Sequence, residues 1–437
     1  MTTSTSFRVF WGLALLTAAL RFYALGAGSF QIDEAMSIVG AAQWRQGFQD
    51  VHPPLFYGLL EQWARFGLSE FWLRSCSVLA SLGSLGLWLR LVRHWRPELA
   101  VPCGLMLAVS FAELQQAREV RMYAWLELWT LAYLVAWLED RRKLAALALL
   151  GAVFTHLFGL FLVPLGYFCR KAWSRWVPVV LALWFAWAVP HYLGQRDHPL
   201  GLRQTPGLSM GVEAVGRLLS GRIAPFGDSF SIAIGAVALV WLLWRRPACP
   251  RLVYAWALLP WLSVWVVSRF TPLQIFEFKY LVWTVPAWIY LLAASLPGRF
   301  LLPVWLAINL WGIVPYLQSP HRWLANWRAA AQALRASSQV VCVHPSMMAA
   351  PLFCYGVQSR VQLVDEWSQL QPERDMIWVS TPNHPYVVHQ HLLVGIRQYW
   401  KLEKQLDFSS ELPSSEIQVT FWRWGQGPPS GGEKQGR

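Results

Sequence analysis

Charged residues are scarce in this sequence: Asp, Glu, Lys and Arg make up 14% of its 437 residues, against about 25% in a typical soluble protein. Hydrophobic residues make up 55%, and long apolar runs recur from Phe10 to about Leu317. This composition excludes an ordinary soluble protein. It predicts an α-helical polytopic membrane protein that contacts the lipid bilayer along most of the chain.

Cysteine is also scarce, with six residues and no CxxC or Cys/His spacing of the kind that holds zinc. Cysteine-based metal modules are therefore excluded. Four cysteines fall in or beside apolar runs, where we expect inert thiols: Cys76, Cys103, Cys169 and Cys249. Cys342 and Cys354 lie in the C-terminal part, where a disulfide between them stays open if that part is extracytoplasmic.

The net charge is +13, but the sequence has no low-complexity basic arm that would indicate nucleic-acid binding. Basic residues cluster in short loops between apolar runs, as at 141–143 and 245–251, and most acidic residues fall in the other loops. The positive-inside rule assigns the basic loops to the cytoplasm. We therefore expect a multi-pass plasma (inner) membrane protein with a cytoplasmic N terminus.

The apolar runs predict about eleven transmembrane helices, at about 20 residues each. The first run precedes Gly-Ala-Gly-Ser, which resembles a signal-peptide cleavage site, but the many later runs favour a first span. The two short runs 144–156 and 157–169 could instead form one kinked helix. Clusters of basic residues before and after the pair favour two spans, because both clusters are expected in the cytoplasm. The predicted spans are 8–25, 71–92, 98–112, 121–138, 144–156, 157–169, 176–193, 229–244, 252–268, 278–295 and 300–317.

The composition changes near residue 321 and predicts three parts: a transmembrane domain (1–320), a small extracytoplasmic α/β domain (321–425) and a disordered tail (426–437). Within the first part, 33–47 and 54–66 are predicted to be amphipathic helices, and 194–228 a long external loop that orders on substrate binding. In the second part, strands are predicted at 339–344, 361–364, 376–380 and 417–424, and helices at 323–337, 346–355 and 385–400.

The first predicted extracytoplasmic loop, Gly28–Tyr57, begins with two adjacent carboxylates, Asp33 and Glu34. One of them could act as a general base on an acceptor hydroxyl or amine. The alternative is a helix N-terminus, where acidic side chains are favoured. Ionisable groups are costly at the end of a membrane span, which favours a functional role.

Four other motifs put polar residues at the outer ends of predicted spans. His52 precedes two prolines that fix its place, Glu119 and Arg121 suit a metal ion and a phosphate, and His156 and Lys279 follow at later turns. Each has a structural alternative: a stiff turn, an interfacial ion pair, a hydrogen-bonded histidine or a snorkelling lysine. Together they suit a substrate whose phosphate lies at the headgroup level.

These motifs resemble those of the integral-membrane GT-C glycosyltransferases, and most closely glycosyltransferase family 39, with the protein O-mannosyltransferases and the lipid A aminoarabinose transferase. The likeness covers about residues 8–295. HPPLFY (52–57), followed by SEFWLRSCSVLASLGSLGLWL (69–89), is its most specific part, and REVRMYAW, FTHLFGLFL and FEFKYLVWTVPAW resemble other family motifs. In the last of these, Lys279 replaces the usual arginine. NWRAA (326–330) resembles the start of an external domain in bacterial members.

The resemblance implies a GT-C fold and an inverting transfer of sugar from a polyprenyl-phosphate donor to an extracytoplasmic acceptor, which could be a protein, a lipid or a glycan. It implies that Asp33 is the base or orients it, with Glu34 beside it. It also implies a donor-phosphate site and a substrate site. The phosphate ligands would be Arg121, Lys279 and His52, and the substrate site would include Glu119, Tyr123, His156 and Tyr57. Glu119 could also hold a divalent metal ion, a requirement that the resemblance leaves open.

Two other classes of function stay open. A transporter or flippase of a lipid-linked or anionic substrate would need charged groups deep within spans, where Glu127 is the clearest carboxylate. A non-catalytic assembly protein would keep its function when Asp33 is replaced by Asn. Neither composition nor motifs identify the sugar, the acceptor, the lipid length or the oligomeric state.

Overall fold

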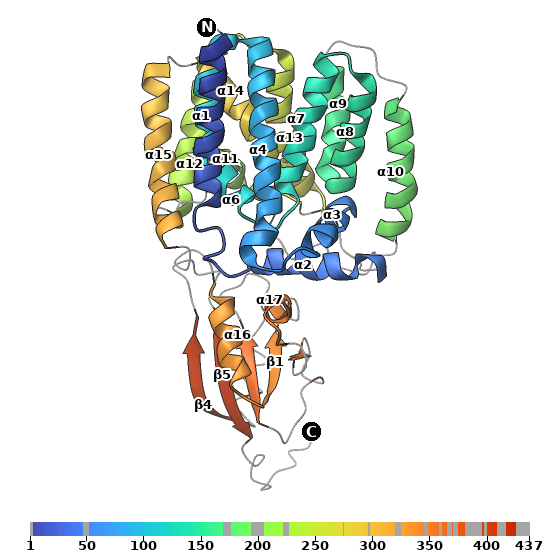
Figure 1. The fold of residues 1–437 in the computed structure, drawn as a ribbon, viewed down its shortest axis with the longest axis vertical. Coiled ribbons are helices and arrows are strands. Elements are labelled where there is room, and N and C mark those ends of the chain that lie inside the picture. Colours follow the sequence, from blue (N-terminus) through green and yellow to red (C-terminus); the bar gives the residue numbers. More distant parts are fainter. Residues whose placement is uncertain are drawn as a thin grey trace, which may run out of the picture. The chain divides into compact units, whose positions relative to one another are not determined.

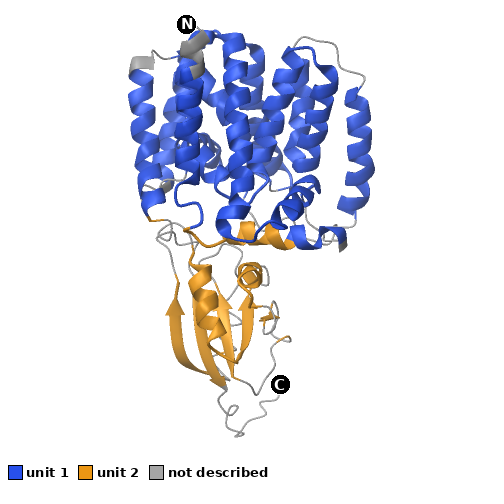
Figure 2. Ribbon diagram, viewed as in Figure 1, with its two compact units in different colours: residues 1–26, 40–318 blue, residues 27–39, 319–437 orange. Residues whose placement is uncertain are grey.

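The computed structural model describes residues 3–46, 52–168, 176–193, 205–221, 227–273, 275–295, 298–319, 325–344, 348–357, 361–364, 369, 375–380, 396, 400–408 and 417–424, and Figure 1 shows their fold. The chain forms two compact units, one of residues 1–26 and 40–318 and the other of residues 27–39 and 319–437 (Figure 2). The second unit thus includes part of the first predicted loop. The domain boundary predicted at residue 320 assigned that part to the transmembrane domain.

The first unit is helical, and in it α4 lies between α1 and α7 (Figure 1). Every predicted span coincides with a helical segment. Two short helices, α6 and α11, were not predicted. The bounds are α1 Thr3–Phe22, α2 Ile32–Gln43 (shared between the units), η1 Trp44–Gln46, α3 Leu55–Ala64, α4 Glu70–Trp95, η2 Pro97–Leu99, α5 Ala100–Ala108, α6 Phe111–Ala117, α7 Tyr123–Leu138, α8 Arg142–Thr155, η3 Leu157–Phe161, α9 Leu162–Tyr167, α10 Trp176–Leu193, α11 Leu208–Ser220, α12 Gly227–Arg245, α13 Arg251–Phe270, η4 Phe278–Thr284, α14 Val285–Ser295 and α15 Gly298–Gln318.

Five of the described helices are long and apolar enough to cross a membrane: α4, α10, α12, α13 and α15. The count becomes six if the bent pair of segments 97–108 and 111–117 is one span. These helices make the chain an integral membrane protein. The remaining predicted spans fall on helices that do not meet this test of length and apolarity, so the total of eleven stays a prediction.

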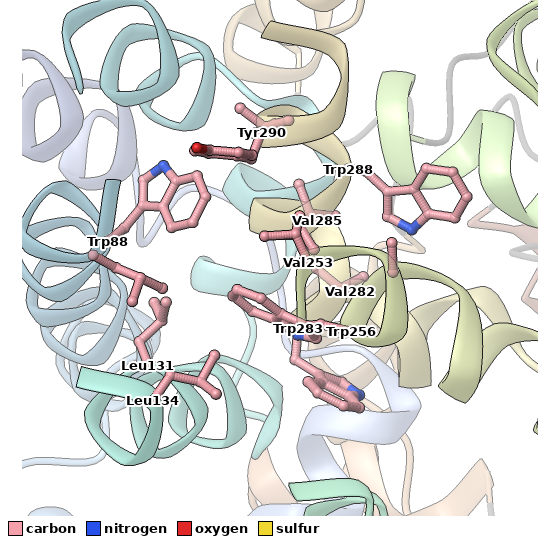
Figure 3. Packing of buried hydrophobic residues seen from close by; sticks show 14 of the residues in the cluster. Trp88, Leu131, Leu134, Val253, Trp256, Val282, Trp283, Val285, Trp288 and Tyr290 are labelled. Atoms are coloured by element: carbon pink, nitrogen blue, oxygen red, sulfur yellow. The ribbon is translucent and has the colours of Figure 1, made fainter. Parts of the chain in front are cut away.

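Large aromatic side chains fill the core of the first unit (Figure 3). Trp88 of α4 packs edge-to-face against Trp256 of α13 and Tyr290 of α14, with ring centroids 6.2 and 6.3 Å apart. All three rings are fully buried. Such aromatic pairs each add about 0.5–1.5 kcal/mol beyond the burial of their area. The core therefore ties α4 to α13 and α14 and gives the turns at the helix ends a rigid support.

The prediction of an external loop at 194–228 is wrong for residues 208–220, which form α11. This helix packs backbone-to-backbone on α12: a Cβ on Gly216 would collide with the carbonyl of Ser231, and one on Gly235 with the carbonyl of Val212. Small residues permit such close approach of helices in membranes. The predicted ordering on substrate binding has no support in this packed segment.

The second unit contains a five-stranded sheet in the order β2-β1-β3-β5-β4. β1, β2 and β3 are parallel, whereas β5 is antiparallel to β3 and β4. The helices α16 and α17 contribute to the apolar core with residues of β1, β3 and β5. The bounds are β1 Val340–His344, β2 Val361–Leu363, β3 Met376–Ser380, β4 Trp400–Asp407, β5 Gln418–Trp424, α16 Trp327–Arg335 and α17 Ala349–Cys354.

The predicted α/β domain is therefore confirmed, with two exceptions. β4 was not predicted, since its sequence WKLEKQLD carries charges on both faces, as edge strands often do. Nearly all of the predicted helix 385–400 lies outside the described residues. Cys342 and Cys354 do not form a disulfide. Burial in the sheet raises the pKa of the Cys342 thiol to about 12, which keeps it protonated and unreactive.

Candidate functional site

Arg121 lies in the short turn between α6 and α7. Its backbone N–H donates to the carbonyl of Glu119 (2.8 Å) and its own carbonyl accepts from the hydroxyl of Ser77 on α4 (3.3 Å). Its Nη2 lies 3.3 Å from both the Tyr123 hydroxyl and Nε2 of His52. The side chain is buried, and a guanidinium keeps its charge even when buried. The turn therefore presents a fixed cation.

Two histidines from different segments meet beside this cation. The ring centroids of His52, which precedes α3, and His156, which follows α8, are 5.2 Å apart. Nδ1 of His156 accepts a hydrogen bond from the N–H of Phe158 (3.1 Å), which in a neutral ring leaves the proton on Nε2. This buried Nε2 has no hydrogen-bond partner among the residues that the structure describes. A buried donor without an acceptor is costly, so its position suits a ligand oxygen.

Aromatic rings complete the group. Tyr280 of η4 lies 5.6 Å from His156 and 5.8 Å from Tyr123, between ring centroids. Nζ of Lys279 lies 5.7 Å from the centroid of the Tyr280 ring. We refer to His52, Arg121, Tyr123, His156 and Tyr280 as the Arg121 cluster. It can hold an anion through its charge and N–H donors, and an apolar or sugar face through its rings.

Four of the motifs singled out in the sequence thus converge in the first unit. Two other predicted substrate-site residues, Tyr57 and Glu119, are buried and half-buried, respectively. Tyr57 is buried on α3, where its ring contacts Phe56 at 6.2 Å. The half-buried carboxylate of Glu119 lies within electrostatic range of Tyr316 on α15. Among the described residues, no three His, Cys, Asp or Glu side chains converge into a group that could hold a metal ion.

Arg118, three residues before Arg121, has a structural role. Its Nη1 donates to the carbonyls of Arg21 (2.8 Å) and Tyr23 (2.7 Å), and its Nη2 to that of Ala24 (3.2 Å). These carbonyls lie at the end of α1, where a helix has no partners of its own for them. Sequence reasoning did not find this role, since main-chain acceptors leave no signal in the sequence.

The adjacent carboxylates Asp33 and Glu34 belong to the second unit and have different surroundings. Glu34 is buried, and its Oε2 accepts the N–H of Gln31 (2.9 Å), just before the first residue of α2. This is the acidic half of a capping box, so the helix-cap interpretation holds for Glu34. Asp33 is half-buried, and its carbonyl accepts the hydroxyl of Ser37 (3.1 Å). Asp33 is therefore the better candidate for chemistry.

A second charged group, which was not predicted as a unit, lies inside the helices of the first unit. Arg21 of α1 donates to the Ser81 hydroxyl (2.8 Å) and the Ala108 carbonyl (3.1 Å). The carboxyl groups of Glu113 on α6 and Glu127 on α7 lie close to each other and within electrostatic range of Arg21. All three charged residues are buried. The group ties α1 to α4, α5, α6 and α7.

No family model and no curated protein matches the chain. Among solved structures, ArnT from Cupriavidus metallidurans is similar in its apo state (TM-score 0.58) and bound to undecaprenyl phosphate (TM-score 0.56). In each comparison the identity is 14%, with 96% of this chain and 98% of ArnT covered. The Pmt1–Pmt2 O-mannosyltransferase complex of S. cerevisiae, with its sugar donor, gives a TM-score of 0.36 at 21% identity, over 44% of this chain and 33% of that one. The ArnT likeness confirms the predicted GT-C fold.

Proposed function

We propose that this chain is a glycosyltransferase of family 39, which moves a sugar from a polyprenyl-phosphate donor to an acceptor outside the cytoplasm, with inversion at the sugar carbon. The observation that carries the proposal is the Arg121 cluster. It gathers a buried cation, two histidines and two tyrosines, with an unsatisfied N–H on His156. The GT-C fold and the undecaprenyl phosphate bound to the similar ArnT support a lipid-phosphate ligand.

In this proposal the cluster binds the phosphate that links lipid and sugar. Arg121 and His52 bind the phosphate oxygens directly, and Lys279 adds a second positive charge. When the bond from sugar to phosphate breaks, its electron pair passes to the phosphate oxygen and negative charge builds up there. Fixed cations stabilise that charge without rearranging. Tyr123, Tyr280 and His156 line the sugar side, and Tyr57 and Glu119 are proposed as further substrate contacts.

Asp33 is the proposed base. Its carboxylate takes the proton of the acceptor hydroxyl or amine as the acceptor oxygen or nitrogen forms the new bond to the sugar carbon. The products are the glycosylated acceptor and a polyprenyl phosphate. A positioned base of this kind contributes about 10²–10⁴-fold to a rate. Glu34 supports Asp33 by capping α2, and a divalent metal ion at Glu119 stays a separate proposal.

The test is sugar transfer in proteoliposomes from a panel of polyprenyl-phosphate sugars to protein, lipid and glycan acceptors. We expect one donor class to be used by the wild type. Arg121→Gln should weaken the binding of polyprenyl phosphate to the purified protein by about tenfold or more, since one charged hydrogen bond contributes about 1.5–3 kcal/mol. Arg269→Gln, which removes an exposed arginine at the end of α13, serves as the matched control. Equal binding by all three proteins would contradict the proposal.

One observation favours the alternative, a transporter or flippase of a lipid-linked or anionic substrate. Arg21, Glu113 and Glu127 place charge inside the helical bundle, where it is expensive and commonly functional. The same proteoliposomes distinguish the two functions. Transport predicts movement of the lipid-linked sugar across the bilayer without acceptor, and its loss in Glu127→Gln. Transfer to an acceptor without such movement supports the enzyme.

A further inference from the structure

The segment just before Asp33 is built into the α/β unit. Ser29 is fully buried. Its hydroxyl donates to the carbonyl of Ala325 (2.7 Å) and accepts the N–H of Trp327 (3.1 Å). Trp327 opens α16 and is itself fully buried. A small polar residue of the first predicted loop therefore bonds to two main-chain groups at the start of α16.

Gln31 pairs with the same stretch of main chain. Its Nε2 donates to the carbonyl of Ala325 (3.1 Å), and its Oε1 accepts the N–H of Ala325 (3.2 Å). The side-chain amide thus satisfies both polar groups of one residue. Two such bonds to one residue fix both the distance and the rotation of the segment, as a single bond would not.

Phe30 and Ile32 add apolar contacts on the same unit. The N–H of Phe30 donates to the hydroxyl of Tyr355 (2.7 Å), and the two rings stack with centroids 5.9 Å apart. Tyr355 follows the end of α17. Ile32 packs against the apolar core that α16, α17 and the sheet share. Four consecutive residues are therefore held, and the next residue is Asp33.

We propose that Ser29, Gln31 and Tyr355 are positioning residues that hold the Asp33 carboxylate in its reactive orientation. If these residues position Asp33, the α/β unit is required for catalysis with every acceptor. The inference rests on the proposed function of Asp33 as the base. Displacements of about 1 Å in a reacting group can cost about 10²-fold in rate, so small losses of anchoring should be measurable in kcat.

The experiment uses the full-length purified protein and compares Ser29→Ala, Tyr355→Phe and Tyr355→Ala with the control Thr420→Val. Thr420 lies on β5, where its hydroxyl donates to the Trp378 carbonyl (3.3 Å) and accepts from Nε1 of Trp422 (2.8 Å). The control therefore loses one bond to a main-chain carbonyl and one from an N–H group, as Ser29→Ala does, in the same unit but outside the anchored segment. The measurements are kcat, the KM for the donor, the thermal midpoint and amide hydrogen exchange over residues 28–36.

Ser29→Ala and Tyr355→Phe should lower kcat on the order of 10- to 100-fold and leave the donor KM within about twofold. Tyr355→Ala, which also loses the ring contact, should lower kcat further. Thr420→Val should lower the thermal midpoint and keep kcat. Wild-type kcat in Ser29→Ala and Tyr355→Phe, or an equal loss in Thr420→Val, would overturn the positioning role.

Amide exchange separates this inference from the proposed function. If the wild type transfers no sugar from any donor, the function is wrong, but the exchange measurement still decides the anchoring. Faster exchange over residues 28–36 in Ser29→Ala and Tyr355→Phe, with no change in Thr420→Val, supports the anchoring. Unchanged exchange in all variants overturns it.

Discussion

In the proposed function, the first unit contributes a cation site and the second unit contributes a base. In the first unit, the Arg121 cluster draws its side chains from four segments that are far apart in the sequence, and four of its five members lie at a helix end or in a short turn, with Tyr280 within η4. In the second unit, Asp33 lies on one continuous segment that a few hydrogen bonds to main-chain groups hold in place. A cation site for a leaving phosphate needs convergence, whereas a single base needs only orientation. The comparison predicts that substitutions in the first unit act mainly on donor affinity, and those near Asp33 mainly on turnover.

The largest expected effect separates the two adjacent carboxylates. Asp33→Asn should lower kcat by about 10²–10⁴-fold, because the amide cannot accept the proton of the acceptor. Glu34→Gln should change kcat only a few-fold, since the glutamine oxygen can still accept the N–H of Gln31. Initial rates at saturating donor measure both. An equal loss of kcat in the two variants would contradict the assignment of Asp33 alone as the base and would indicate that both carboxylates are needed.

The next effect separates two arginines of one motif. Arg121→Lys should raise the donor KM by about tenfold, because an ammonium loses the planar fork that binds phosphate oxygens. Arg118→Lys should leave that KM within about twofold and lower the stability by about 1–3 kcal/mol, because its guanidinium caps three carbonyls at the end of α1. Thermal unfolding in detergent and donor titrations provide the two readouts. A raised donor KM in Arg118→Lys would contradict this distinction and indicate that Arg118 also binds the donor phosphate.

The smallest effect concerns Glu61, an acid of α3 outside the cluster. A hydrogen bond from Nε1 of Trp44 (2.9 Å), with the nearby charge of Arg45, lowers the pKa of Glu61. The resulting stabilisation is complete above the unfolded-state pKa of about 4.3 and is lost as the pH falls through the lower folded-state value. Glu61→Gln should therefore lower the thermal midpoint slightly at pH 7, and the difference should vanish in acid. Transfer activity should be unchanged, and a loss comparable to that of Asp33→Asn would make Glu61 part of the site.

The sequence predicted the parts of the fold that depend on long patterns. Each predicted span falls on a helical segment, and strand-length apolar runs predicted four of the five strands among the described residues. It missed α11 because a short amphipathic helix between glycines and prolines resembles a loop. It missed β4 because an edge strand rich in charge lacks the alternation of a buried one.

The sequence predicted most residues of the candidate site but not which nearby residues have structural roles. The motifs around His52, Arg121, His156 and Lys279 could be singled out, and the structure brings them together. The helix cap was one of the two interpretations open for Asp33 and Glu34, but the capping role of Arg118 and the anchoring by Ser29 and Gln31 could not be found. Their partners are main-chain groups, which every residue carries, so no residue type in the sequence marks them.

The close packing of α11 on α12 also bears on the order in which the chain is assembled in the membrane. At 1.5 Å per residue, α11 is about 20 Å long, too short for a hydrocarbon layer of about 30 Å. It precedes α12 in the chain, yet the glycine surface that it packs against exists only once α12 has been inserted. We therefore expect α11 to leave the ribosome first and to reach its final place after the helix that follows it, so that insertion and folding are separate events for this segment.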